Sequence, residues 1–412
     1  MRVYKFGGAS VRNAAAISNV ASILEGSDSP LLVVVSAMGK TTNALERIVA
    51  LAQNDRSIEM EMDQLRTYHL EMVNQLFKDK NLVLADLEKI LRKIEIESVK
   101  KDDYDKIYDQ VVSQGEVISS FILSHYLMEI GIANEWIDAC HFVCTDNTFR
   151  EGKVDWVKTE GNIQKLHEIL AEKIIITQGF IGSTPEGLTT TLGREGSDFT
   201  AAIFASCLKA ESVTIWKDVP GVMSADPKRL PAAIVFAELP YKEAAEMTYY
   251  GASVIHPKTI KPLANKGIPL FVKNFDNSTL TGTKIHECKV DHLPPLIVFK
   301  DNQCLISCKV TDYTFIDEHH LLFIFNALSK KNIKINVMQN SAISFSFCVD
   351  FREHKIISLV RELGKKFEVY YNTGLTLITI KNYNQKTFDE YRLRPGVVLE
   401  QSSRSTLQVL VK

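Results

Sequence analysis

TTTLGREGSDFTAAIFASCL, from Thr189 to Leu208, is the stretch on which the fold prediction depends. Its polar, glycine-containing part predicts a loop from Thr189 to Ser197. The rest predicts an amphipathic helix with one packing side, formed by Phe199, Ala202, Ile203, Ala205, Ser206 and Leu208. Hydroxyls, Arg194 and two glycines at a helix entrance favour an anion site built from backbone N–H groups, and Asp198 suits the dipole of the first turn. An ordinary capped helix after a surface loop is the alternative for this string alone.

Short apolar runs alternate with helical patterns on both sides of this stretch. They predict strands at residues 3–6, 31–35, 137, 174–177, 213–216 and 269–273, with long helical segments over residues 45–130. The unbroken run Leu31–Val35 is typical of a parallel sheet that helices cover on both faces. The order predicts an α/β fold, an open and mainly parallel sheet sandwiched by helices, with binding loops at the carboxyl ends of the strands.

A different pattern begins near residue 302. It predicts strands at residues 305–310, 336–339, 343–349 and 375–380, and helices at 319–331 and 354–367. This βαββαβ order is the ferredoxin-like α+β arrangement. A polar tail, 382–405, and a last strand, 406–411, follow it. We therefore expect two domains, 1–285 and 300–412, with a hinge within 276–299.

Composition excludes several classes of protein. The 412 residues carry 48 Lys and Arg against 50 Asp and Glu, so no basic excess indicates nucleic acid binding. No apolar run approaches the roughly 18–20 residues that span a bilayer, and the first residues enter a strand without a signal-peptide pattern. The seven scattered cysteines form no CxxC pair, which favours reduced thiols and a cytoplasmic protein. Adjacent His319 and His320 diverge by about 100° on a helix, so we expect no metal site there.

The amino end, KFGGAS from Lys5 to Ser10, has a composition suited to phosphate. Its glycines let the backbone approach a ligand closely, and the Lys5 ammonium is a movable point charge. The motif lacks the spacing of a Walker loop and of a GxGxxG dinucleotide fingerprint. Alone it is weak, because a lysine before a glycine turn is more often solvated than catalytic.

Six blocks together resemble those of aspartate kinases, in the amino acid kinase family. They occur in that family's order over residues 3–275: KFGGAS (5–10), SAMGKTTN (36–43), SQGEVISS (113–120), TTTLGREGSD (189–198), WKDVPGVMSADPK (216–228) and EAAEMTYYGASVIHPKTIKPL (243–263). The βαββαβ region resembles the regulatory ACT module that such kinases carry. The resemblance implies an amino acid kinase-like catalytic domain followed by an ACT-like domain, single or reduced.

The resemblance implies that ATP, with Mg²⁺, phosphorylates the β-carboxylate of L-aspartate to 4-phospho-L-aspartate, the first step to lysine, threonine and methionine. Lys5 would contact the transferred phosphoryl group, and Asp198 would orient that lysine. Substrate would be held by Thr42, Glu116, Arg194 and Ser197. Nucleotide would be held by Gly7, Gly8, Ser10, Lys217, Asp218, Gly221, Met223 and Lys228. The prediction requires that Lys5, Arg194 and Asp198 meet in one pocket where two anions react.

The sequence departs from the family pattern near the nucleotide. Ala9 stands where the family usually has threonine, and Ser253 where it usually has a lysine that is thought to serve the phosphates. Lys217 or Lys258 would then compensate for the missing charge. Lys228 replaces a common arginine, which keeps the charge but loses the bidentate geometry.

The carboxyl-terminal region and the alternatives complete the prediction. An exposed edge of an ACT-like sheet needs covering, which favours a homodimer. Lysine or threonine is a possible effector, although the residues near Thr314, His319 and Asn340 mark neither. The alternatives are a catalytically weak amino-acid sensor, which Ala9 and Ser253 favour, and a kinase for another small acid such as glutamate, acetylglutamate or carbamate.

Overall fold

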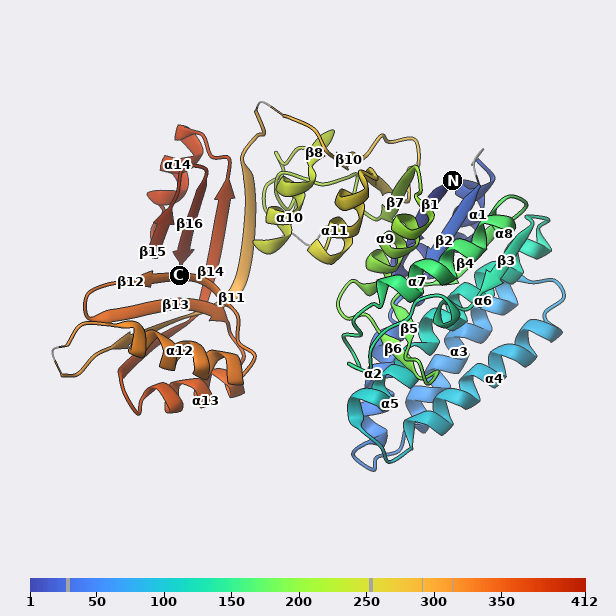
Figure 1. Cartoon of the computed structure of the whole chain (residues 1–412), viewed down its shortest axis with the longest axis horizontal. Coiled ribbons are helices and arrows are strands. Elements are labelled where there is room, and N and C mark those ends of the chain that lie inside the picture. Colours follow the sequence, from blue (N-terminus) through green and yellow to red (C-terminus); the bar gives the residue numbers. More distant parts are fainter. Residues whose placement is uncertain (27–29, 252–254, 291, 313) are drawn as a thin grey trace. The chain divides into compact units, whose positions relative to one another are not determined.

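The computed structural model describes the chain except for residues 27–29, 252–254, 291 and 313 (Figure 1). The chain divides into two compact units. The first comprises Met1–Val222, Val235–Ala245 and Ser253–Val290, and the second comprises Met223–Ile234, Glu246–Ala252 and Asp291–Lys412. The domain limits of 1–285 and 300–412 stay a prediction.

An eight-stranded sheet organises the first unit, in the order β3-β4-β2-β1-β7-β9-β10-β8. The strands are β1 (Arg2–Phe6), β2 (Leu31–Val35), β3 (Asn134–Ile137), β4 (Ile174–Gln178), β7 (Ser212–Lys217), β8 (Glu238–Pro240), β9 (Leu270–Asn274) and β10 (Thr283–His286). All neighbours pair in parallel except β9 and β10. The mainly parallel α/β prediction is confirmed.

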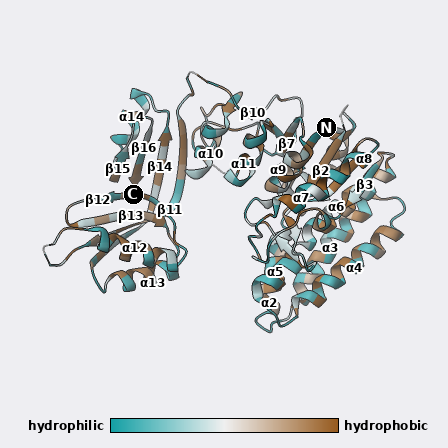
Figure 2. Cartoon of the chain, viewed as in Figure 1, coloured by the Kyte–Doolittle hydropathy of each residue, from teal (hydrophilic) through white to brown (hydrophobic). Residues whose placement is uncertain are grey.

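Helices cover this sheet, as an unbroken apolar strand requires. Leu31–Val35 is buried at every residue, and Figure 2 colours the central strands as hydrophobic. The helices are α1 (Ala14–Glu25), α2 (Thr41–Ala52), α3 (Glu59–Leu76), α4 (Asn81–Ser98), α5 (Tyr104–Val112), α6 (Gln114–Glu129), α7 (Trp156–Ile163), α8 (His167–Leu170), α9 (Gly196–Leu208), α10 (Tyr241–Tyr249) and α11 (Pro257–Lys266). A short hairpin, β5 (Ile181–Ser183) and β6 (Thr189–Thr191), precedes α9.

Strand β1 lies where the strand order reverses. The chain passes from β1 to β2 on one side and later returns to β7 on the other side. In open α/β sheets, ligands bind beyond the carboxyl ends of the strands at such a reversal. The loops after β1, β2 and β7 are therefore the expected place for a site.

Helix α9 corrects two sequence predictions. Every residue from Gly196 to Leu208 except Phe199 is buried, so the helix is not amphipathic. It packs against β1, β2 and β7 on one side and against α7 and α11 on the other, so no side remains for water. The predicted loop from Thr189 to Ser197 is also partly wrong, because Thr189–Thr191 pairs with β5 as strand β6.

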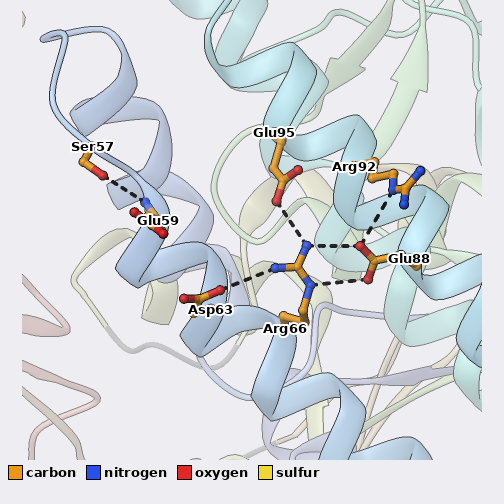
Figure 3. A network of polar contacts seen from close by, with 7 residues as sticks. All are labelled: Ser57, Glu59, Asp63, Arg66, Glu88, Arg92 and Glu95. Atoms are coloured by element: carbon orange, nitrogen blue, oxygen red, sulfur yellow. Dashed lines mark hydrogen bonds and ion pairs between the residues drawn. The ribbon is translucent and has the colours of Figure 1, made fainter.

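Helices α3 and α4 are held together by a charged network (Figure 3). The guanidinium of Arg66 on α3 lies 3.1 Å from carboxylate oxygens of both Glu88 and Glu95 on α4. Hydrogen bonds to these two carboxylates raise the pKa of Arg66, although burial opposes the rise. The groups are partly exposed, so the network orients the helices more than it stabilises them.

A six-stranded antiparallel sheet forms the main part of the second unit, in the order β12-β13-β11-β14-β16-β15. Its elements are β11 (Leu296–Lys309), α12 (Glu318–Lys330), β12 (Ile335–Asn340), β13 (Ser344–Asp350), α13 (Glu353–Leu363), β14 (Glu368–Lys381), α14 (Gln385–Arg392), β15 (Val397–Ser402) and β16 (Thr406–Val411). The predicted βαββαβ order is present, and the α+β prediction for this region is confirmed.

The polar tail holds more structure than its sequence indicates. Helix α14 places Tyr391 in a core with Ile380 and Leu407, and β15 pairs with β16. Strands β11 and β14 are long and pair with each other along their length. The pair therefore borders both the core around Tyr391 and the core that lies under α12 and α13. Tyr391 and strand β15 thus complete a second, reduced half of the sheet, although the residues around them in the sequence are mostly polar.

Candidate active site

Two lysines lie at the carboxyl ends of the central strands. Lys5 is the last but one residue of β1, and Lys217 is the last residue of β7. The parallel register puts Lys5 beside Ile215, two residues before Lys217. The strands of this sheet therefore bring two ammonium groups to the edge where its binding loops begin.

Asp198 is the partner of both lysines. One carboxylate oxygen lies 2.6 Å from Lys5 Nζ, and the other lies 3.4 Å from Lys217 Nζ. The side chains are 3% exposed for Asp198, 9% for Lys5 and 21% for Lys217. Burial alone would raise the pKa of Asp198, but the charges of Lys5 and Lys217 together hold it below its usual value. The carboxylate stays ionised and holds both ammonium groups in place.

The glycine turn after β1 fits closely against the loop after β2. A Cβ atom added to Gly8 would lie 2.7 Å from the carbonyl oxygen of Ala37, so only glycine fits there. Gly39 N donates to the Gly8 carbonyl at 3.0 Å, and Ser10 N donates to the Gly7 carbonyl at 2.9 Å. Ser10 itself is buried in the short 3-10 helix Gly8–Val11. Both loops are thus held against each other beside Lys5.

Glu116, on α6, reaches the same loop from the other direction. One of its oxygens accepts a hydrogen bond of 3.2 Å from Ala37 N, and the other is buried with no hydrogen-bond partner among the described residues. Burial raises the pKa of Glu116 to about 8, against the opposing effects of the Ala37 N–H and the Lys5 charge. A buried carboxyl group with an unpartnered oxygen is a candidate binding group for a positively charged ligand.

The loop between β6 and α9 carries the remaining predicted substrate residues. Arg194 is exposed and makes no hydrogen bond or ion pair with any residue that the structure describes. Glu195 has a φ of +54°, which turns the chain sharply into α9. Ser197 is buried against Gly179, where an added Cβ would lie 2.4 Å from the Ser197 Cβ. Thr42 is half-buried at the start of α2. The exposed guanidinium of Arg194 and the two lysines at Asp198 are cations of the kind that bind carboxylates and phosphates, and their meeting in one pocket stays a prediction.

A family model and several known proteins match this chain. The model for the amino acid kinase family matches residues 1–274. The chain belongs to the amino acid kinase family. Within that family, the lysine-sensitive aspartokinase 3 of Escherichia coli is 32% identical over 393 residues, which cover 92% of this chain and 86% of the relative.

The other matches agree with an aspartokinase. A bifunctional aspartokinase/homoserine dehydrogenase of Zea mays is 36% identical over 69% of this chain, and the match covers 32% of that longer protein. Escherichia coli aspartokinase III, solved in complex with aspartate and ADP, matches with a TM-score of 0.84 and 30% identity over 100% of this chain and 96% of that one. The resemblance to aspartate kinases is thereby confirmed. No helix among the described residues is long and apolar enough to cross a membrane.

The residues that the sequence predicts to bind nucleotide are divided between the two units. Asp218 is exposed just after β7. Gly221 has a φ of +156°, and an added Cβ would lie 2.6 Å from Thr283 Oγ1, so the turn requires glycine. Met223 and Lys228 belong to the second unit, and their role stays a prediction. Ser253 lies outside the described residues.

Lys217 and Lys258, the two candidates for a compensating charge, differ in their surroundings. Lys217 contacts Asp198, as described above. Lys258 lies near the loop that carries Arg194, since a Cβ added to Gly193 would be 3.7 Å from its Nζ. Of the two, Lys217 is the one whose ammonium reaches the carboxylate that Lys5 binds.

Sequence reasoning missed Asp109, a buried residue of α5. Its carboxylate accepts from Thr191 N at 2.8 Å, from Thr191 Oγ1 at 2.7 Å and from Arg150 N at 2.9 Å. Burial raises its pKa to about 6, although these donors act in the opposite direction. Asp109 thus fixes the end of β6, three residues before Arg194. An acid in a helical pattern looks like a solvated side chain, so no signal in the sequence distinguishes it.

Proposed function

We propose that this kinase transfers the γ-phosphoryl group of ATP to the β-carboxylate of L-aspartate and releases 4-phospho-L-aspartate and ADP. The observation that carries the proposal is the buried Lys5–Asp198–Lys217 cluster, with Glu116 beside it. Phosphoryl transfer to a carboxylate needs no proton removal from the acceptor. It needs two anions to be aligned and their charge to be neutralised. A site with two held ammonium groups meets that need.

Lys5 and Lys217 stabilise the charge that spreads over the transferred phosphoryl oxygens. Asp198 acts through them: it forms ion pairs with both ammonium groups and so fixes their positions before substrates arrive. Because Lys5 and Asp198 are almost fully buried, their charges act in a low dielectric, where they are stronger than in water. The backbone of Gly7 and Gly8 lines the phosphates, and Ser10 completes this turn.

The substrate groups are assigned by charge. Glu116 takes the ammonium of aspartate, which supplies the cation that its unpartnered oxygen lacks. Arg194 takes the α-carboxylate, because its planar fork suits bidentate capture. Thr42 and Ser197 donate hydrogen bonds to the substrate. With both charged groups on the α-carbon held, the β-carboxylate at the other end points to the phosphoryl group near Lys5.

ATP brings Mg²⁺ to the site. The donors present fit an ion held mainly by phosphates and water, because the buried carboxylate of Asp198 is already bound by two lysines. When bound, Mg²⁺ neutralises charge on the phosphates. On the protein side, Asp218 and Gly221 line the adenosine end, and Lys217 serves the phosphate end of the nucleotide. Met223 and Lys228, which belong to the second unit, stay a prediction from the sequence.

The second unit would serve assembly and regulation. Strand β12 forms one edge of its sheet, and Met338 on it is 48% exposed. On β14, an inner strand of the same sheet, Tyr370 is 56% exposed and Tyr371 is 49% exposed. An unpaired edge with large apolar side chains favours pairing with a second copy. We therefore propose a homodimer through this sheet. A structure of the Escherichia coli relative contains lysine and aspartate, which makes lysine the first effector to test and threonine the second.

The test is an initial-rate measurement of ADP release with L-aspartate, L-glutamate, N-acetylglutamate and carbamate as acceptors. We expect turnover with L-aspartate at least about a hundredfold above the others, since Glu116 and Arg194 anchor the α-carbon, and only an acceptor of the right length then places its carboxylate at the phosphoryl group. Absence of turnover with all four acids would favour the catalytically weak sensor instead. The same assay with lysine or threonine added, together with the molar mass in solution, tests the effector and the dimer.

A further inference from the structure

Three side chains that can ligate a metal ion meet at the edge of the first sheet, outside the active site. Strand β8 ends the sheet and pairs in parallel with β10, so that Lys284 stands opposite Glu238. Glu238 is the first residue of β8, His286 the last of β10, and Cys288 follows two residues later. One ligand atom from each of these three lies within 4.8 Å of the other two. They are the one such group among the described residues.

The geometry suits a tetrahedral ion. His286 Nε2 lies 3.3 Å from Glu238 Oε2. Ligands about 2.0–2.2 Å from a tetrahedral zinc ion lie roughly 3.3–3.5 Å apart, so these two atoms already have the spacing of neighbouring ligands. His286 and Cys288 are half-buried and Glu238 is exposed, so two of the ligands are partly shielded from solvent while the third is open to it.

The ligand set indicates which ion fits. A thiolate, an imidazole and a carboxylate together suit Zn²⁺, whereas Mg²⁺ prefers oxygen ligands only. We propose that Glu238, His286 and Cys288 form a zinc site with water as the fourth ligand. Lys284 and Glu287 are the other charged residues near the thiol, and their charges oppose each other.

The site has a structural consequence. Strand β8 has three residues and pairs with β10 alone, so few backbone hydrogen bonds hold it. Cys288 lies two residues before Val290, where the first unit ends. An ion bound to Glu238 on β8, to His286 at the end of β10 and to Cys288 two residues after it fastens the edge strand near the residue where the first unit ends. The active-site residues are not ligands, so the site acts on stability rather than on the chemical step.

The experiment is a titration of the metal-free full chain with Co²⁺ in the presence of excess Mg²⁺. We expect one Co²⁺ per chain, a thiolate-to-cobalt charge-transfer band, and displacement by Zn²⁺. Cys288→Ser removes the band. His286→Gln and Glu238→Gln weaken binding at least about tenfold, because loss even of a group that only orients a ligand costs that much.

Cys140→Ser is the matched control. Cys140 is also half-buried, but its Sγ lies near the Gly182 carbonyl and outside any such group. We expect this variant to bind Co²⁺ as the unaltered chain does. Kinase activity in each preparation reports that the variant is folded. A band that persists in Cys288→Ser, or binding that Zn²⁺ does not displace, would overturn the proposal.

Discussion

A buried lysine stands near the end of a strand in each unit, and the two differ in their surroundings. Lys5 on β1 is 7% exposed and Lys381 on β14 is 4% exposed. Lys5 pairs with Asp198, which is 2% exposed, and lies beside glycine loops in a parallel sheet. Lys381 lies in an antiparallel sheet and pairs with Glu246, whose side chain is 37% exposed. A buried ion pair thus indicates a reactive site only where open loops and a second cation accompany it.

The strongest test of this comparison is Lys5→Met. We expect kcat to fall about a thousandfold or more, since cations at the transferred phosphoryl group contribute on that scale. The thermal unfolding of the variant should stay cooperative, because Lys217 still pairs with Asp198. Initial rates with saturating aspartate and ATP measure the effect. A kcat within about threefold of the original would place the chemistry away from β1.

The comparison also explains which parts could be predicted. Apolar runs predicted six strands of the first sheet but not β8 and β10, and the order of motifs marked Lys5, Glu116 and Asp198 as candidates, because these signals are local in sequence. The contact of Lys217 with Asp198 depends on two strands lying side by side, and the sequence placed Lys217 with the nucleotide instead. Helix α9 looked amphipathic, but burial depends on what packs on its second side. Tyr391 was hidden among polar residues for the same reason.

Glu116→Gln sharpens the comparison on the substrate side. We expect KM for aspartate to rise about ten- to a hundredfold, since a hydrogen bond to a charged group contributes roughly 1.5–3 kcal/mol. The pKa of Glu116 is raised to about 8, so the empty site is mainly protonated at neutral pH. KM for aspartate should therefore fall as pH rises towards about 8 in the original protein, and should lack this dependence in the variant.

The same residue predicts a pH dependence of stability. The pKa of Glu116 is higher in the folded chain than in the unfolded chain. The folded state therefore keeps a proton at pH values where the unfolded state, with the ordinary pKa of glutamate, has already released it. The stability that the protonated Glu116 contributes is fully present below about pH 4.5 and is lost as the pH rises to about 8. The glutamine variant should gain stability relative to the original over that range. Denaturant unfolding at several pH values checks the sign, and a gain that shrinks with pH contradicts it.

Lys217→Thr tests whether the second cation matters. The Lys217 side chain is 21% exposed and its Nζ is farther from Asp198 than that of Lys5, so solvent screens part of its effect. We expect kcat to fall about tenfold, which corresponds to about 1.4 kcal/mol in the barrier. Lys258→Thr is the matched control, since Lys258 lies near Gly193 instead. Equal losses in both variants would remove the distinction between them.

Lys381→Met should have the smallest effect on activity and completes the comparison. Methionine keeps the length of the side chain and removes the charge, so Glu246 loses an ion-pair partner but remains in contact with water. Because that carboxylate is solvated, we expect a loss of only about 1 kcal/mol in the free energy of unfolding of the second unit, and a kcat within about twofold of the original. Denaturant unfolding and initial rates measure the two quantities. A loss of kcat as large as that of Lys5→Met would mean that buried lysines in both units serve the reaction, because neither glycine loops nor a second cation would then separate the reactive pair from the structural one.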